Sequence, residues 1–261
     1  MRQKIITATK NEFFLFFTAL MFFSRIPCPK KLPYSNDLLN HSIRYFPLIG
    51  MIIGGISAIV FIIASNLWNT NIAVVISMVA TIFCTGAFHE DGLCDSCDGF
   101  GGGFNRMDVL RIMKDSRIGS YAAIGICLAL LLKFATLTSI DNKIIPVAMI
   151  CGHTISRYFT ALFLRILPYA KEDNALSKIK PLATQMTNND LVVLTACGLL
   201  PLFIFLSIKQ LLIVLCFLSA LMIVLKIYFY QRIEGYTGDT LGASQQLFEL
   251  LFYLIIAAVQ F

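Results

Sequence analysis

The sequence predicts an all-α fold: a polytopic membrane helix bundle of about seven spans plus a short N-terminal interfacial or re-entrant helix. Of its 261 residues, 57% are hydrophobic and 14% are charged, with a mean hydropathy of +0.77. A soluble domain carries about 25% charged residues. Apolar stretches of about 20 residues, the length that crosses a bilayer, recur along the chain. We therefore expect residues 1–261 to form one integral-membrane domain.

The expected spans follow from the length and position of these apolar stretches. They are residues 45–66, 71–88, 118–138, 144–167, 190–208, 210–230 and 241–261. The segment 13–24 is shorter, and the sequence leaves open whether it is interfacial, re-entrant or an eighth span. Residues 1–26 also resemble a signal peptide. The bulky run from Phe22 to Pro27 offers no cleavage site, so we expect the segment to be retained.

Basic residues are divided unequally between the two sets of connections. One set holds only Lys143 and Lys209. The other set, within residues 25–44, 89–117, 165–189 and 231–240, holds thirteen: Arg25, Lys30, Lys31, Arg44, Arg106, Arg111, Lys114, Arg117, Arg165, Lys171, Lys178, Lys180 and Arg232. The rich set is expected to face the cytoplasm. The net charge of +6 then suits anionic lipid headgroups and does not indicate a nucleic-acid partner.

Acidic residues are crowded into one short segment. Six of the fifteen lie there: Glu90, Asp91, Asp95, Asp98, Asp108 and Asp115. Asp91, Asp95 and Asp98 are spaced i, i+4, i+7, so they share one face if the preceding span continues as a helix. Such a stripe predicts a Mg²⁺ site, because this ion prefers oxygen ligands. Glu90 points about 100° away and is a weaker metal ligand. The alternative is a solvated acidic loop, but like charges at i, i+4 destabilise an unliganded helix.

Groups that bind phosphate follow the acidic run. Bare glycines let phosphate oxygens approach backbone amides, and three occur in succession: Gly101, Gly102 and Gly103. Such runs are usually only turns, but this one precedes Arg106. Asp115 and Arg117 lead into the next span, where Arg117 is placed to clamp a diphosphate. The remaining cations of segment 106–117 suit equally an interfacial helix anchored by lipid phosphates.

Three further groups of residues allow more than one interpretation. His89, Cys94 and Cys97 suggest zinc, but a fourth ligand is lacking and the nearby oxygens favour a harder ion. His153 and Arg157 lie one turn apart inside a span, where ionisable groups are costly. We favour a substrate role for them over a structural pair. Asp239 is a further metal or supporting carboxylate; the alternative is helix capping by Asp239 or by Thr240.

The segments His89–Gly103 and Ile112–Tyr121 together resemble the cobalamin synthase family, also called adenosylcobinamide-GDP ribazoletransferases. Two further stretches carry the resemblance: Phe23–Pro27 with Tyr45–Gly50, and Gly235–Ala243. The similarity covers nearly the whole chain in order. Glu90 departs from the family, where leucine is frequent, and Cys94 and Cys97 stand where small residues are usual.

The resemblance implies an enzyme of the last stage of adenosylcobalamin (vitamin B12) biosynthesis, in the cytoplasmic (inner) membrane. Its small-molecule substrates would be adenosylcobinamide-GDP and α-ribazole or its 5′-phosphate, the product GMP, and the cofactor Mg²⁺. Asp91, Asp95 and Asp98 would hold the metal. Asp115, Arg117 and Asp239 would complete the site.

The expected mechanism is phosphoryl-group transfer on one metal ion or two. The sequence does not decide which of four groups takes the proton: Asp91, Asp95, Asp98 or His89. Arg25, Arg106 and Arg117 are expected to neutralise phosphate oxygens. A CDP-alcohol phosphotransferase-like or prenyltransferase-like enzyme is one alternative, and a divalent-cation transporter is another. Membrane lipid is an expected partner, and the oligomeric state, including a homo-oligomer, stays open.

Overall fold

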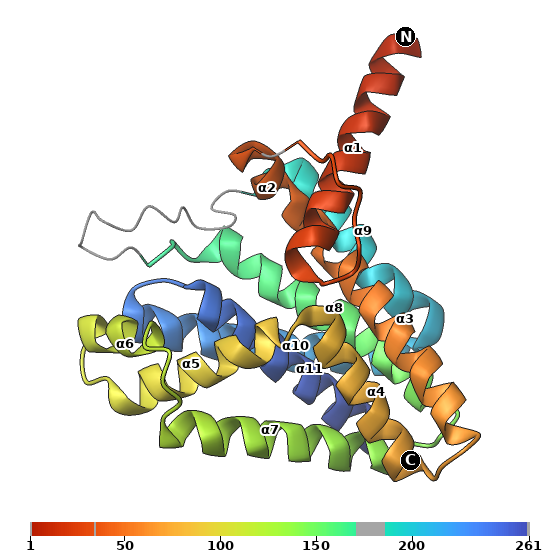
Figure 1. Cartoon of the computed structure of the whole chain (residues 1–261), viewed down its shortest axis with the longest axis vertical. Helices are drawn as coiled ribbons and strands as arrows, with labels where there is room; N and C mark the ends of the chain where they lie inside the picture. The colour runs from red at the N-terminus through yellow and green to blue at the C-terminus, as the bar shows by residue number, and fades with distance from the viewer. Residues whose placement is uncertain (1, 34, 171–185, 260–261) are drawn as a thin grey trace.

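The computed structural model describes residues 2–33, 35–170 and 186–259, and every named element in these ranges is a helix or a helical turn (Figure 1). Of the basic residues counted above, Lys171, Lys178 and Lys180 lie outside these ranges. The elements in order are α1 Arg2–Phe23, α2 Asn36–Ser42, the 3₁₀ turn η1 Ile43–Tyr45, α3 Phe46–Ser65, α4 Thr70–Thr85, α5 Phe88–Gly102, α6 Arg106–Met113, α7 Ser120–Ser139, α8 Ile145–Ile166, α9 Asn188–Phe205, α10 Ile208–Ile233 and α11 Gly238–Val259.

The predicted membrane bundle is confirmed. Within the described residues, six helical segments are long and apolar enough to cross a membrane, and their ends lie within a few residues of predicted spans, except that the first begins at Asn36. The short N-terminal helix is in fact the end of the 22-residue α1. Its apolar part, Asn11–Phe23, is shorter than a span. Figure 1 shows the start of α1 extending away from the other helices.

The predicted span 71–88 does not continue straight into the acidic run. Helix α4 stops at Thr85, and α5 leaves at an angle of 89° to it. Gly86 and Ala87 both have left-handed backbones, with φ of 70° and 60°, which ends α4. The two helices count as a seventh span only if the bent pair is taken together. The acidic run is nevertheless helical, so the predicted spacing of its aspartates holds.

Small residues allow the helices around the site to approach closely. A methyl group on Gly50 of α3 would lie 2.2 Å from the backbone oxygen of His153 in α8. A methyl group on Gly92 of α5 would lie 2.8 Å from the backbone oxygen of Asp239 and 3.1 Å from Gly242, both in α11. Side chains larger than hydrogen are excluded at these crossings. The crossing of α5 and α11 therefore places the acidic run beside the start of α11.

Backbone hydrogen bonds tie together two of the connections rich in basic residues. Ala170 donates to the carbonyl of Tyr236 at 2.9 Å, and Tyr236 donates to the carbonyl of Pro168 at 3.0 Å. Helix α6 packs its apolar side, Val109, Leu110 and Met113, against Ile233 at the end of α10. Thr70 and Asn142, from two connections poor in basic residues, are joined by a 3.0 Å hydrogen bond. The basic-rich connections are thus joined to one another, and so are two of the basic-poor connections.

Candidate active site

Four carboxylates gather where α5 crosses the beginning of α11. Asp91, Asp95 and Asp98 come from α5, and Asp239 is the second residue of α11. The Asp95 carboxylate is repelled by those of Asp239, Asp91 and Asp98. Asp239 is repelled by Asp91 and attracted by Lys114, which follows α6. Asp91 is exposed, and the other three are partly buried. The structure thus places Asp91, Asp95 and Asp98 near Asp239, whereas Glu90, the fourth predicted metal ligand, turns toward Gln246.

These carboxylates are donors of the type that Mg²⁺ prefers. Across residues 2–33, 35–170 and 186–259, no three His, Cys, Asp or Glu side chains already converge as a metal-ligand set. Mg²⁺ usually takes only one or two protein carboxylates and completes its shell with water and substrate phosphates. The donor chemistry therefore fits a substrate-assisted magnesium site. Within the same residues, the zinc alternative at His89, Cys94 and Cys97 lacks an assembled ligand set.

Asp98 has a second role that the sequence did not reveal. Its two oxygens accept hydrogen bonds from the backbone amides of Gly119, at 2.6 Å, and Ala122, at 2.9 Å. These amides open α7, so Asp98 caps that helix from a different helix and places a negative charge at its positive end. The carboxylates of Asp91 and Asp95 make no such contacts among the described residues. Of the three aspartates, Asp98 is therefore the one whose oxygens are already engaged in holding two helices together.

The start of α11 is capped by Thr237. Its hydroxyl accepts the amide of Thr240 at 3.2 Å, and the Thr240 hydroxyl accepts the amide of Thr237 at 2.8 Å. Helix capping by Asp239 or by Thr240 was the alternative role considered above; here Thr237 and Thr240 form the cap between them, and the Asp239 side chain is not the cap. The Thr237 hydroxyl also donates to Asp239 at 3.4 Å. The Asp239 carboxylate is thus oriented by the cap without being the cap itself.

The predicted glycine-rich loop is instead the end of a helix. Gly101 and Gly102 belong to the last turn of α5, and Gly103 follows it. A methyl group on Gly101 would lie 2.5 Å from the Tyr121 ring, and one on Gly103 would lie 2.7 Å from the Val109 amide. The carbonyl of Gly103 accepts a 2.7 Å hydrogen bond from Arg232. The structure accounts for Gly101 and Gly103 by close packing, and phosphate binding by the three glycines stays a prediction.

The three arginines expected to contact phosphate have different surroundings. Arg25 is exposed, and its guanidinium lies against Gly86 at the break between α4 and α5. Arg106 donates to the carbonyl of Ile233 at 3.3 Å. Arg117 donates to Asp115 at 3.0 Å, and this hydrogen bond lowers the pKa of the Asp115 carboxyl to about 2. Arg117 and Asp115 are therefore an exposed ion pair that remains charged at neutral pH.

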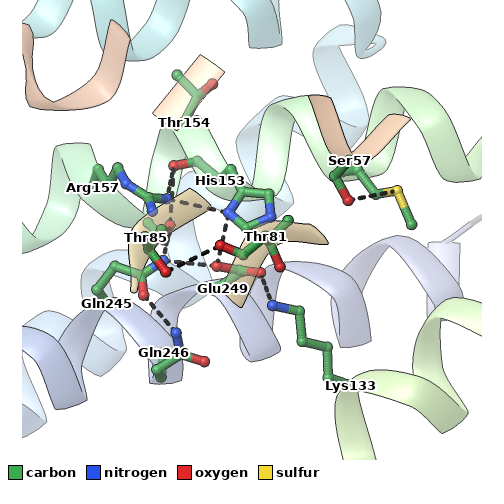
Figure 2. Close-up of polar contacts among 12 residues, drawn as sticks. Ser57, Thr81, Thr85, Lys133, His153, Thr154, Arg157, Gln245, Gln246 and Glu249 are labelled. Atoms are coloured by element: carbon green, nitrogen blue, oxygen red, sulfur yellow. Dashed lines mark hydrogen bonds and ion pairs between the residues drawn. The ribbon is translucent and has the colours of Figure 1, made fainter. Parts of the chain in front are cut away.

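His153 and Arg157 belong to a buried polar network in the middle of the bundle (Figure 2). Glu249 of α11 pairs with Lys133 of α7 and, at 3.2 Å, with Nδ1 of His153. Arg157 donates to the His153 carbonyl at 2.9 Å. Each of the four side chains is 6% exposed or less. His153 and Arg157 are in contact and buried in mid-bundle, which is the arrangement of the structural-pair alternative. The substrate role favoured above stays a prediction.

Sequence reasoning missed Lys133 and Glu249, although a signal was present. Each is a lone charged residue within a predicted apolar span, and such residues almost always face the interior and find a partner. Their opposite charges predict a pair. His89, by contrast, was noticed; it is 2% exposed, and its ring stacks on Phe46 at 5.8 Å between centroids.

Known proteins resemble the chain over almost its full length. The family model described as cobalamin-5-phosphate synthase matches residues 15–257. The adenosylcobinamide-GDP ribazoletransferase of Shewanella oneidensis is 43% identical over 254 residues, covering 95% of both chains. The protein of the same name from Shewanella frigidimarina is 44% identical over 250 residues, covering 94% of both. No solved structure matches. The chain belongs to the cobalamin-5-phosphate synthase family.

Proposed function

We propose that the chain is an adenosylcobinamide-GDP ribazoletransferase of adenosylcobalamin biosynthesis, with its site where α5 crosses α11. The observation that carries this proposal is the meeting of Asp91, Asp95 and Asp239 beside Gly92, in a chain 43% identical to transferases of that name. The site lies at helix ends, next to the basic segment 106–117. That position suits large, charged, water-soluble substrates.

The reaction is a phosphoryl-group transfer. A ribose hydroxyl of α-ribazole or of its 5′-phosphate attacks the phosphorus that carries cobinamide. The bond from this phosphorus to the GMP oxygen breaks, and GMP leaves with the electron pair. Mg²⁺, when bound, would neutralise the diphosphate and stabilise the leaving phosphate. Asp91 and Asp95 would hold it together with Asp239, and Asp98 contributes less because its oxygens accept backbone amides.

The proton of the attacking hydroxyl needs an acceptor near these carboxylates. His89 is buried against Phe46, and Asp98 caps α7. Asp95 lies partly buried near Asp91 and Asp239 and, unlike Asp98, caps no helix among the described residues. We assign the base role to Asp95. Arg25 and Arg106 lie near the two ends of α5, where they can neutralise phosphate oxygens. Arg117 would exchange Asp115 for substrate phosphate.

The experiment is direct. Purified protein in detergent or nanodiscs is given adenosylcobinamide-GDP, α-ribazole and Mg²⁺, and GMP release is followed together with the corrinoid product. We expect GMP only when all three are present, and loss of release with EDTA that excess Mg²⁺ restores. Parallel assays with α-ribazole 5′-phosphate measure the preferred acceptor. Absence of GMP from properly folded protein would refute the proposal.

A metal-flux assay tests the transporter alternative. Proteoliposomes that release Mg²⁺ or Co²⁺ down a gradient, without substrate, would favour transport. The only buried acid in the middle of a described span, Glu249, is already paired with Lys133 and His153. We therefore expect no flux.

A further inference from the structure

A chain of side-chain hydrogen bonds runs from the acidic helix into the buried network. The Nε2 group of Gln246 donates to Glu90 at 3.2 Å and to Oε1 of Gln245 at 2.9 Å. The Nε2 group of Gln245 donates in turn to Glu249 at 2.7 Å and to the Ser156 hydroxyl at 3.0 Å. Figure 2 shows the part of this chain from Gln246 to Lys133. Every amide hydrogen on the path therefore meets an oxygen acceptor.

The charges of this network balance only if Glu90 is included. Without Glu90 the network has two cations, Lys133 and Arg157, and one anion, Glu249. His153 adds no charge unless it is protonated. Arg157 is attracted by both Glu249 and Glu90. Within a bundle surrounded by lipid, an uncompensated charge costs several kcal/mol. Glu90 thus supplies the second negative charge.

The direction of Glu90 differs from that of its neighbour Asp91. Glu90 reaches Gln246 of α11, and its second oxygen, Oε2, is fully buried with no hydrogen-bond partner among the described residues. The Nε atom of Arg157 is buried in the same unpartnered state. Asp91, one residue later, is exposed. The two consecutive carboxylates, about 100° apart on the helix, therefore face different surroundings: Glu90 the buried network and Asp91 the site.

We propose that Glu90 is a positioning residue, which locks the rotation of α5 against α11 as the second counter-ion of the Lys133–Glu249–His153–Arg157 network. This inference rests on the proposed function, because the residues it positions are Asp91 and Asp95. Helix α5 begins at a sharp turn and cannot be aligned by continuation of α4. An inward ionic anchor beside Asp91 fixes which face of α5 meets the substrate. Small misplacements of catalytic groups are costly, about 100-fold in rate for 1 Å.

The test is a double-mutant cycle read by thermal unfolding, which needs no turnover. Glu90→Gln keeps the size and an acceptor oxygen for Gln246 but removes the charge. We expect the Tm to fall by at least about 5 °C, because a buried ion is left unpaired. Adding Arg157→Gln restores the balance, so the double variant is expected to lose less Tm than the sum of the single losses. Strict additivity would overturn the pairing.

Kinetics separates positioning from metal binding. We expect Glu90→Gln to lower kcat about tenfold or more, while the KM for adenosylcobinamide-GDP and the half-saturating Mg²⁺ concentration stay within about twofold. A tenfold rise in the Mg²⁺ requirement would instead make Glu90 a metal ligand. Unchanged Tm and kcat would also overturn the inference.

Glu12→Gln is the matched control, because it removes another ion-paired glutamate, bound to Arg44 outside the network; its kcat should not change. Failure of the wild-type protein to release GMP would refute the proposed function alone, because the Tm cycle is read independently.

Discussion

Single residues in the acidic run divide between chemistry and structure according to what their oxygens contact. Asp98 accepts two backbone amides of α7, and Glu90 accepts an amide from Gln246 on the inner side. Asp91 and Asp95 share the remaining face with Asp239. Spacing alone made the three aspartates equivalent, whereas their contacts make them unequal. Substitutions at Asp95 and Asp98 should therefore have different consequences.

Replacement of Asp95 should remove activity without unfolding the protein. We expect Asp95→Asn to lower kcat at least about 100-fold, because both a metal oxygen and the proton acceptor are lost. Cys97→Ala is the control from the same helix. Its Sγ atom packs against Gly125 of α7, 2.6 Å from where a methyl group on that glycine would lie, and the smaller alanine fits the same space, so a mild effect is expected. The comparison uses GMP release and Tm. An Asp95→Asn enzyme of near-normal rate would disprove the assignment.

Replacement of Asp98 should act first on stability. Asp98→Ala leaves the amides of Gly119 and Ala122 without their cap, at a cost of about 1 kcal/mol. Asp98→Asn retains one acceptor oxygen and should recover part of the Tm. Thermal unfolding of both variants in the same detergent measures this difference. Equal Tm values for Asp98→Ala and the wild type would show that the cap contributes nothing.

Whole elements were largely predictable because bilayer thickness sets their length. The spans from α7 to α11 begin and end within a few residues of the predicted stretches. The break after Thr85 was not predicted, because it depends on left-handed backbones at Gly86 and Ala87, and alanine rarely adopts one. The buried network was also missed. Lys133 and Glu249 are 116 positions apart, and only packing of α7 on α11 unites them.

The crossing of α5 and α11 depends on a glycine at its centre. In Gly92→Ala the added methyl group would lie 2.8 Å from the Asp239 carbonyl, so the helices must separate. We expect a loss of about 1–3 kcal/mol and a lower kcat, because Asp239 moves away from Asp91 and Asp95. Gly55→Ala is the matched control in α3. Nothing lies within 4 Å of its methyl position, so it should be neutral or stabilise by up to about 1 kcal/mol. Equal effects of the two substitutions would contradict this account.

The whole molecule has one end that carries the site, and the charges of its loops predict which side of the membrane that end faces. Helix α11 starts beside the site at Gly238 and runs for 22 residues, long enough to cross the bilayer. A reporter fused after Val259 should therefore lie on the side opposite the site. We propose that the site is cytoplasmic, since the basic-rich connections flank it.

Alkaline phosphatase fused after Val259 should be active, and green fluorescent protein there should be dark. Fusions after Ser116, in the connection between α6 and α7, should give the reverse. Phosphatase activity at Ser116 would place the site outside the cytoplasm, away from its nucleotide substrate.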